Sequence, residues 1–157
     1  MNARAAGGSA RRACAAAAAA CLWAAAPAAG AEFRSVASAA AVLYDAPSQQ
    51  ARKLFVAPRG MPVEVLSVVN QWVKVREMEG SLVWVERADL SATRTVISKV
   101  AAATVRVAPQ EGADTVFQAE RGVVLELTES APAPGWVRVR HRDGTSGYVR
   151  AVDVWGL

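Results

Sequence analysis

The chain has 157 residues, of which 53% are hydrophobic and 20% are charged, and its formal net charge is +4 at pH 7. Three of the 18 lysines and arginines lie in the first 31 residues, and the remaining 15 nearly balance the 14 acidic residues. This balance does not supply the concentrated basic patch that nucleic-acid binding usually requires, so we expect no nucleic-acid partner.

Residues 1–31 have the pattern of a secretory signal peptide. Three arginines precede an apolar, alanine-rich run over residues 13–26, and small residues at 29–31 suit a signal peptidase that cuts before Glu32. The apolar run is shorter than the ~20 residues that a membrane-spanning helix needs. We therefore expect a periplasmic or secreted protein with no membrane span after cleavage.

Two alternatives for this segment stay open. It could be retained as a membrane anchor, or a lipid could be attached at Cys21, which follows three small residues. Both cysteines of the chain, Cys14 and Cys21, lie in this segment. The exported part would then contain no thiol, so we expect no disulfide, no thiolate metal site and no cysteine nucleophile.

One sequence pattern occurs twice after this segment, which indicates two similar structural units. The matched stretches are residues 43–47 with 105–109 and 59–65 with 121–127, both at an offset of 62, and residues 72–76 with 136–140 at an offset of 64. The two extra residues fall within residues 131–135, where we expect a longer loop. We place the two domains at residues 32–91 and 92–157.

Each unit has the pattern of short β-strands, because valine and leucine alternate with polar residues between Gly, Pro, Asn and Asp. In residues 72–76 the two valines should point to one face, and the tryptophan and two cations to the other. Residues 77–80 and 141–144 predict hairpin turns, and residues 87–90 predict a single 3₁₀ turn. About five short strands in ~60 residues predict a small barrel.

A barrel of this size is marginally stable by itself, particularly without a disulfide. The connector at residues 91–93 is short, so we expect the two barrels to pack against each other. We also expect Trp155, near the apolar end of the chain, to lie in a core or in the interface.

The matched stretches resemble the bacterial SH3-like (SH3b-type) domain family. The second unit fits this family closely, whereas the first departs from it where Tyr44 replaces an arginine and residues 82–83 replace a glycine before Trp84. The resemblance implies an all-β fold of two tandem SH3-like small β-barrels after a cleaved signal peptide. It also implies a binding role without chemistry of its own, directed at cell-wall peptidoglycan or at peptides.

The candidate ligand-binding surface is aromatic and basic. Its residues are Tyr44, Trp72, Trp84, Arg106, Trp136, Arg138, Arg140 and Tyr148. A flat aromatic ring beside a guanidinium can stack on a sugar or hold a carboxylate, which suits glycan strands or acidic peptides. The structural alternative is that large aromatic side chains fill the ends of the barrels or the domain interface.

Nothing in the sequence indicates catalysis. His141, the only histidine, has no neighbouring metal ligand or nucleophile, and we expect it to be an exposed turn residue. We expect Glu77, Glu79 and Glu86 to be solubilising charges, and we find no glycine-rich phosphate loop or metal-ligand spacing. The sequence thus predicts no enzyme activity, no metal and no cofactor.

The predicted function is that of a periplasmic binding module for cell-wall glycan or peptide. The alternative is a protein-interaction subunit whose partner is another envelope protein. These two roles differ in the surface that must be accessible: an aromatic and basic groove for the first, and a barrel edge or an apolar patch for the second.

Overall fold

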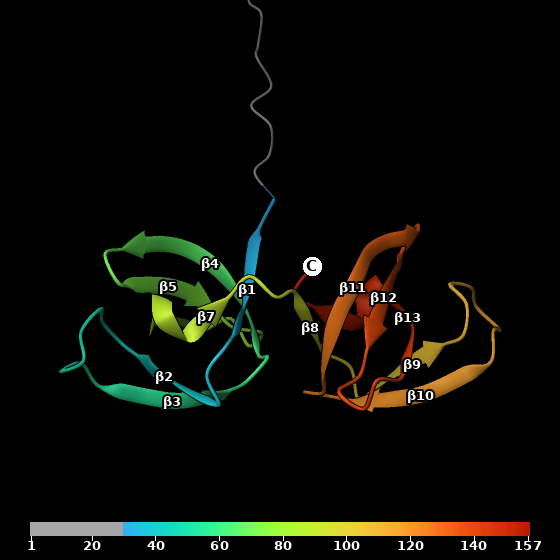
Figure 1. Ribbon diagram of the computed structural model, residues 1–157, viewed down its shortest axis with the longest axis horizontal. Helices are drawn as coiled ribbons and strands as arrows, with labels where there is room; N and C mark the ends of the chain where they lie inside the picture. Colours follow the sequence, from blue (N-terminus) through green and yellow to red (C-terminus); the bar gives the residue numbers. More distant parts are fainter. Residues whose placement is uncertain (1–29) are drawn as a thin grey trace, which may run out of the picture.

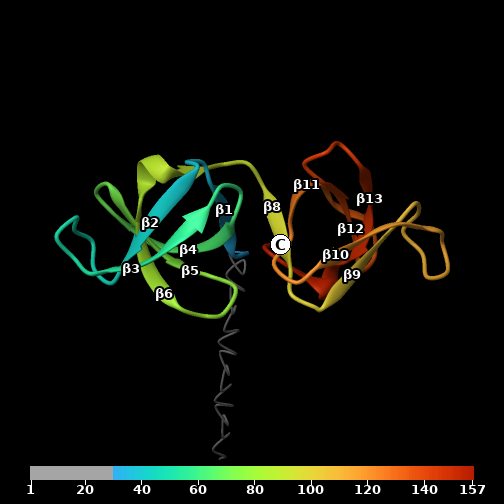
Figure 2. The same cartoon turned by 90° about the horizontal axis from the view of Figure 1, so that it is seen from below.

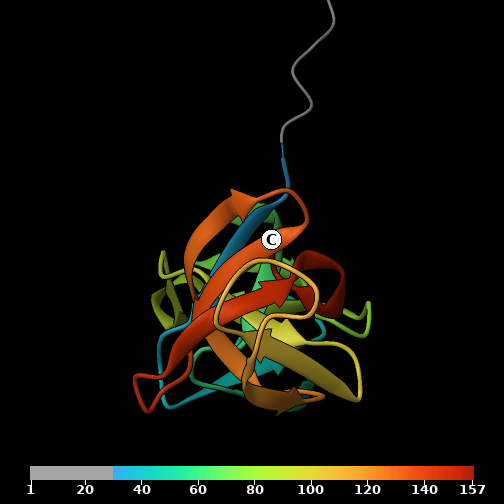
Figure 3. The ribbon, with the colours of Figure 1, turned by 90° about the vertical axis from the view of Figure 1, so that its right-hand side faces the viewer.

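The computed structural model describes residues 30–157, so the expected signal peptide lies almost entirely outside the described residues. The described part is all-β and contains two seven-stranded antiparallel sheets. Each sheet curls into a small barrel, and the two barrels lie side by side along the long axis of the molecule (Figures 1 and 2). In Figure 3, which looks along this axis, the second barrel lies in front of the first.

The two sheets have the same topology, with strand orders β3-β2-β6-β5-β4-β1-β7 and β10-β9-β13-β12-β11-β8-β14. The strands of the first sheet are β1 (Glu32–Val36), β2 (Ala40–Tyr44), β3 (Lys53–Pro58), β4 (Pro62–Val69), β5 (Trp72–Arg76), β6 (Leu82–Glu86) and β7 (Leu90–Ser91). Those of the second are β8 (Thr95–Ser98), β9 (Ala102–Arg106), β10 (Thr115–Glu120), β11 (Val124–Ala133), β12 (Trp136–Arg140), β13 (Ser146–Arg150) and β14 (Val154–Trp155). The repeat in the sequence is therefore a repeat of the fold.

Each sheet has more strands than the expected five. The additional pairing comes from β1 and β8 at the start of each unit, and from β7 and β14, which have only two residues each. Strands of two residues are too short to show an alternating pattern. They follow the 3₁₀ turns η1 (Arg87–Asp89) and η2 (Ala151–Asp153), the first of which confirms the turn expected at residues 87–90.

The alternation of apolar residues predicts the cores correctly. In β5, Val73 and Val75 are buried while Arg76 is exposed. The first core consists of Val36, Ala41, Leu43, Ala57, Val63, Val73, Val75, Val83 and Val85. The second consists of Val96, Ala103, Val105, Ala119, Leu125, Leu127, Val137, Val139, Val149 and Val154. Each barrel thus has its own core, rich in the β-branched valine that packs well on a pleated surface.

The two expected hairpin turns have the same geometry. Gly80 and Gly144 adopt φ of +92° and +93°. Their N–H groups donate to the carbonyl oxygens of Glu77 and His141, each at 2.9 Å. Positive φ is easily reached only by glycine, so the turn chemistry predicted from the sequence is confirmed.

The two barrels contact each other, as expected from their size. The rings of Phe33 and Trp155 pack in a T-shape with centroids 5.0 Å apart, and the Arg94 guanidinium lies 5.8 Å from the centre of the Phe33 ring. Thr95 Oγ1 donates to the carbonyl oxygen of Gly60 at 2.7 Å. Trp155 therefore lies in the interface, one of the two positions expected for it.

Candidate functional site

In the first domain, two candidate side chains and a lysine form a row across adjacent strands. Tyr44 on β2 is the register partner of Trp84 on β6, and Trp84 is the partner of Lys74 on β5. Residues that lie opposite each other in antiparallel strands share one face of the sheet. The Lys74 ammonium lies 5.9 Å from the centre of the Trp84 ring, within range of a cation–π contact.

The second domain has a row at the matching positions. Arg106 on β9 is the register partner of Tyr148 on β13, and Tyr148 is the partner of Arg138 on β12. The Arg138 guanidinium lies 5.9 Å from the centre of the Tyr148 ring. We name these sets the first row (Tyr44, Trp84, Lys74) and the second row (Arg106, Tyr148, Arg138). Both have a half-buried aromatic ring in the middle and a cation beside it.

Other aromatic side chains of the candidate surface are buried. Trp72 is 4% exposed and Trp136 is 9% exposed, so little of either ring can contact a ligand directly. Trp72 meets Tyr44 edge-on with ring centroids 5.2 Å apart, and Tyr44 is itself buried. The accessible aromatic surface of the two rows therefore belongs to Trp84 and Tyr148.

A loop packs beside the row in each domain. In the first, Gln49 Nε2 donates to Glu86 Oε1 at 2.9 Å. In the second, Arg106 donates to the carbonyl oxygen of Ala113 at 2.7 Å, and both Arg106 and Arg150 lie near Glu111, at 3.7 and 3.6 Å. The loop is thus held to the barrel by a side-chain hydrogen bond of Gln49 in one domain and by ion pairs of Glu111 in the other.

Arg150 also forms two hydrogen bonds with the largely buried carboxylate of Asp153, at 2.8 and 3.1 Å. This hydrogen bonding raises the pKa of Arg150 above its usual value. The second row is therefore bordered by a network in which Arg150 is held by Asp153 and approached by Glu111.

The structure does not place Arg140 in the second row. Its guanidinium binds the carboxylate of Glu126, with the closest N–O distances at 2.8 Å. The matching pair in the first domain is Arg76 and Glu64, at 2.7 Å. Lys74, conversely, was missing from the predicted set, although its match to Arg138 at an offset of 64 could have identified it.

Two turn residues differ from expectation. Glu77 is not a solubilising charge: it is 5% exposed, and its carboxylate accepts hydrogen bonds from the backbone N–H groups of Glu79 and Ser81 at 2.7 and 2.8 Å. A carboxylate can satisfy both donors of a tight turn, which favours its burial. His141 is half-buried rather than exposed, because its ring packs 5.7 Å from that of Phe117.

His141 also pairs with Asp143, with 3.0 Å between Nδ1 and Oδ2. The Thr145 backbone N–H, and secondly His141, lower the pKa of Asp143 from 3.8 to about 2. Residues 30–157 contain no group of three or more His, Cys, Asp or Glu side chains arranged to hold a metal ion. No helix within this range is long and apolar enough to cross a membrane.

Comparisons with known proteins concern both domains. Residues 39–91 and residues 99–156 each match a family described as bacterial SH3 domain. No curated protein matches the chain.

Among solved structures, NlpC2 from Trichomonas vaginalis is similar at 16% identity and a TM-score of 0.36, over 78% of this chain and 46% of that one. An NlpC/P60 family protein from Bacillus cereus is similar at 17% identity and a TM-score of 0.36, over 79% of this chain and 56% of that one. The chain thus spans about half the length of these proteins. The family matches agree with the two barrels and their common topology: the chain belongs to the bacterial SH3 family and carries two such domains in tandem.

Proposed function

We propose that this protein is a non-catalytic binding module of the cell envelope that recognises cell-wall peptidoglycan through its two rows. The observation that carries the proposal is a half-buried aromatic ring beside a cation at matched positions in both domains. The face of Trp84 or Tyr148 can stack on a sugar ring, and the neighbouring cation can pair with a carboxylate of a peptide stem.

Two features support a wall ligand over a small soluble one. Peptidoglycan is a polymer, and two linked domains can engage neighbouring units of a polymer at once, which raises the overall affinity above that of either domain. The signal-peptide pattern of residues 1–31 supports a periplasmic or secreted location, where such a polymer is accessible. Membership of the bacterial SH3 family supports binding without catalysis.

The buried aromatic residues have a different part in this proposal. Trp72, packed edge-on against Tyr44, braces the first row, and Trp136 occupies the matching position in the second domain. Arg106 fixes the loop beside the second row through its bond to Ala113. Direct contact with the ligand is assigned to Trp84, Lys74, Tyr148 and Arg138.

The test is co-sedimentation of the purified protein with isolated peptidoglycan sacculi. We expect saturable pelleting that weakens with salt, because the two cations contribute through screened charge interactions. The double variant Trp84→Ala/Tyr148→Ala should bind about tenfold more weakly or worse, as removal of a central aromatic contact typically does.

The matched control is Leu82→Ala/Val152→Ala, which removes one exposed aliphatic side chain from each domain, 50% and 65% exposed, outside the rows. The control should pellet like the unmodified protein. A protein that does not pellet, or a row variant that pellets as well as the control, would refute the proposal.

One observation favours a second role, as a subunit that binds another envelope protein. The edge strand β3 exposes three consecutive apolar side chains, Leu54, Phe55 and Val56, at 39%, 39% and 57%. The matching strand β10 has a glutamine in place of the valine and keeps its phenylalanine half-buried. An exposed apolar edge can pair with a strand of a partner.

This second role is tested by placing a photo-reactive residue at Val56 and, as a control, at the equally exposed Val107 of the second domain. A partner captured in intact cells from position 56 only, and lost when Phe55 is replaced by lysine, would support strand addition at β3. Equal capture from both positions, or none, would contradict it.

A further inference from the structure

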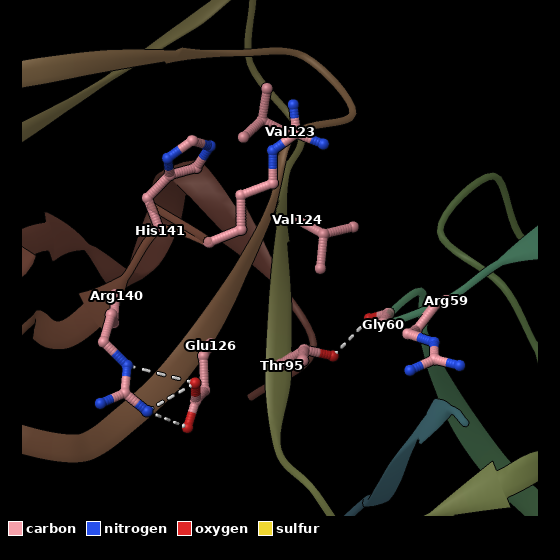
Figure 4. A pocket seen from close by; sticks show the side chains of 9 residues that line it. Arg59, Gly60, Thr95, Val123, Val124, Glu126, Arg140 and His141 are labelled. Carbon is pink, nitrogen blue, oxygen red and sulfur yellow. Dashed lines mark hydrogen bonds and ion pairs between the residues drawn. The ribbon is translucent and has the colours of Figure 1, made fainter. Parts of the chain in front are cut away.

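A groove of about 670 Å³ lies between the two domains and contains none of the residues of the rows. The first domain contributes Arg59 and Gly60, which follow β3, and the second contributes Thr95 on β8 together with the start of β11 and the end of β12. The hydrogen bond from Thr95 to the Gly60 carbonyl joins the two walls (Figure 4).

The groove carries an excess of positive charge. Three arginines, Arg59, Arg140 and Arg142, line it together with a single carboxylate, that of Glu126. Arg140 engages this carboxylate in close hydrogen bonds, as Figure 4 shows. Within residues 30–157, no ion pair or hydrogen bond involves the guanidinium of Arg59 or Arg142. Two arginines thus remain for an anionic ligand.

The floor of the groove is apolar. Val123 and Val124 are half-buried and line it between the charged walls. In Figure 4, Val124 lies between Arg59 on one side and His141 on the other. The volume falls within the range of ~300–1,000 Å³ that is usual for ligand pockets, and such pockets often form between domains. This mixture suits a ligand with apolar atoms between negative groups better than a bare inorganic anion.

The walls are held in place by contacts on both sides of the groove. Gly60 has φ of +82°, and a Cβ atom there would lie 3.3 Å from Val124 Cγ1, so the first domain's backbone passes close to the second. The contact between the rings of Phe33 and Trp155 also holds the two domains together, at a second place outside the groove. A groove with fixed walls loses less entropy on binding than one that must form with its ligand.

We propose that this groove binds a short acidic peptide segment, with carboxylates paired to Arg59 and Arg142 and an apolar portion on Val124. A guanidinium offers two parallel N–H donors to a carboxylate, which makes arginine suitable on both walls. Because the walls belong to different domains, the bound peptide would also strengthen the packing of the two barrels. This site is separate from the rows and does not rest on the proposed binding of peptidoglycan.

The probe is a fluorescein-labelled peptide, Glu-Ala-Val-Ala-Glu with an amidated end, titrated with the purified protein and followed by anisotropy. We expect saturable binding that is lost for the isosteric peptide Gln-Ala-Val-Ala-Gln. The variant Arg59→Gln/Arg142→Gln should bind about tenfold more weakly, which is the combined effect of two exposed ion pairs. Both side chains are exposed and unpaired within the described residues, so this variant should retain its fold.

The matched control is Arg52→Gln/Lys99→Gln, which removes the same charge from exposed positions outside the groove, one in each domain. It should bind the acidic peptide as the unmodified protein does, and so should the row variant Trp84→Ala/Tyr148→Ala. Absence of binding, or equal weakening by the groove and control variants, would overturn the proposal. Displacement of the peptide by an equal concentration of inorganic phosphate would also overturn it, since the groove would then be a general oxyanion site.

Discussion

The two domains have the same barrel topology but carry different side chains at matched positions of the rows. The first row is tyrosine, tryptophan and lysine, whereas the second is arginine, tyrosine and arginine. Beside the rows, Gln49 bonds Glu86 in one domain and Glu111 approaches Arg150 in the other. The cores, in contrast, both consist mainly of valine. Inward side chains therefore specify the barrel, and outward ones are free to differ in what they bind.

The largest effect on the free energy of unfolding is expected at a matched core position where the two domains have side chains of different size. Leu43 and Val105 are matched and fully buried. Leu43→Ala should destabilise the protein by about 2–5 kcal/mol, and Val105→Ala should cost less because it removes fewer carbon atoms from the core. Denaturant unfolding measures both. A larger loss for Val105→Ala would show that the two cores are not equivalent.

A smaller effect on the free energy of unfolding is expected at the two hairpin turns. Glu77→Ala leaves two backbone N–H groups without their carboxylate and should cost about 1–3 kcal/mol. His141→Ala, at the matching position, should cost less, because Asp143 supplies the acceptor for the Thr145 N–H in that turn. The comparison is made by urea unfolding, and equal losses for the two variants would count against a structural role for Glu77.

We expect the interface contacts to make the stability of each domain depend on the other. Phe33→Ala removes the contacts with Trp155 and Arg94 and should cost about 1–2 kcal/mol. In differential scanning calorimetry, the melting temperatures of the two domains should then lie further apart than in the unmodified protein. Phe55→Ala, which removes an exposed ring that takes no part in these contacts, is the control. Identical thermograms for both variants would mean that the domains unfold independently.

The smallest effect concerns pH. The pKa of Asp143 is lowered from 3.8 to about 2, so the folded state favours its carboxylate form. The resulting stabilisation is fully present above about pH 4 and disappears as the pH falls through 2. The difference in melting temperature between the unmodified protein and Asp143→Asn should therefore shrink over this interval. A difference that stays constant from pH 5 to pH 2 would contradict the role of this carboxylate.

The sequence was sufficient for the repeat, the glycine turns and the inward-facing valines, because each depends on neighbouring residues. It offered the burial of Trp72 only as one of two alternatives, since its packing partner Tyr44 lies on another strand, 28 residues earlier in the chain. The prediction for Glu77 was wrong because the alternation of apolar and polar residues does not show which carboxylate accepts hydrogen bonds from the backbone of its own turn. The groove could not be predicted, because Arg59 and Arg142 meet only through the packing of two domains.

The central claim is that the rows form the binding surface of both domains. The most direct test is a set of sacculus-binding isotherms for Trp84→Ala, Tyr148→Ala and the double variant, measured at one low salt concentration. We expect each single variant to bind more weakly than the unmodified protein, and the double variant to lose more than either, because two linked sites contribute together. Three isotherms that coincide with that of the unmodified protein would contradict the claim.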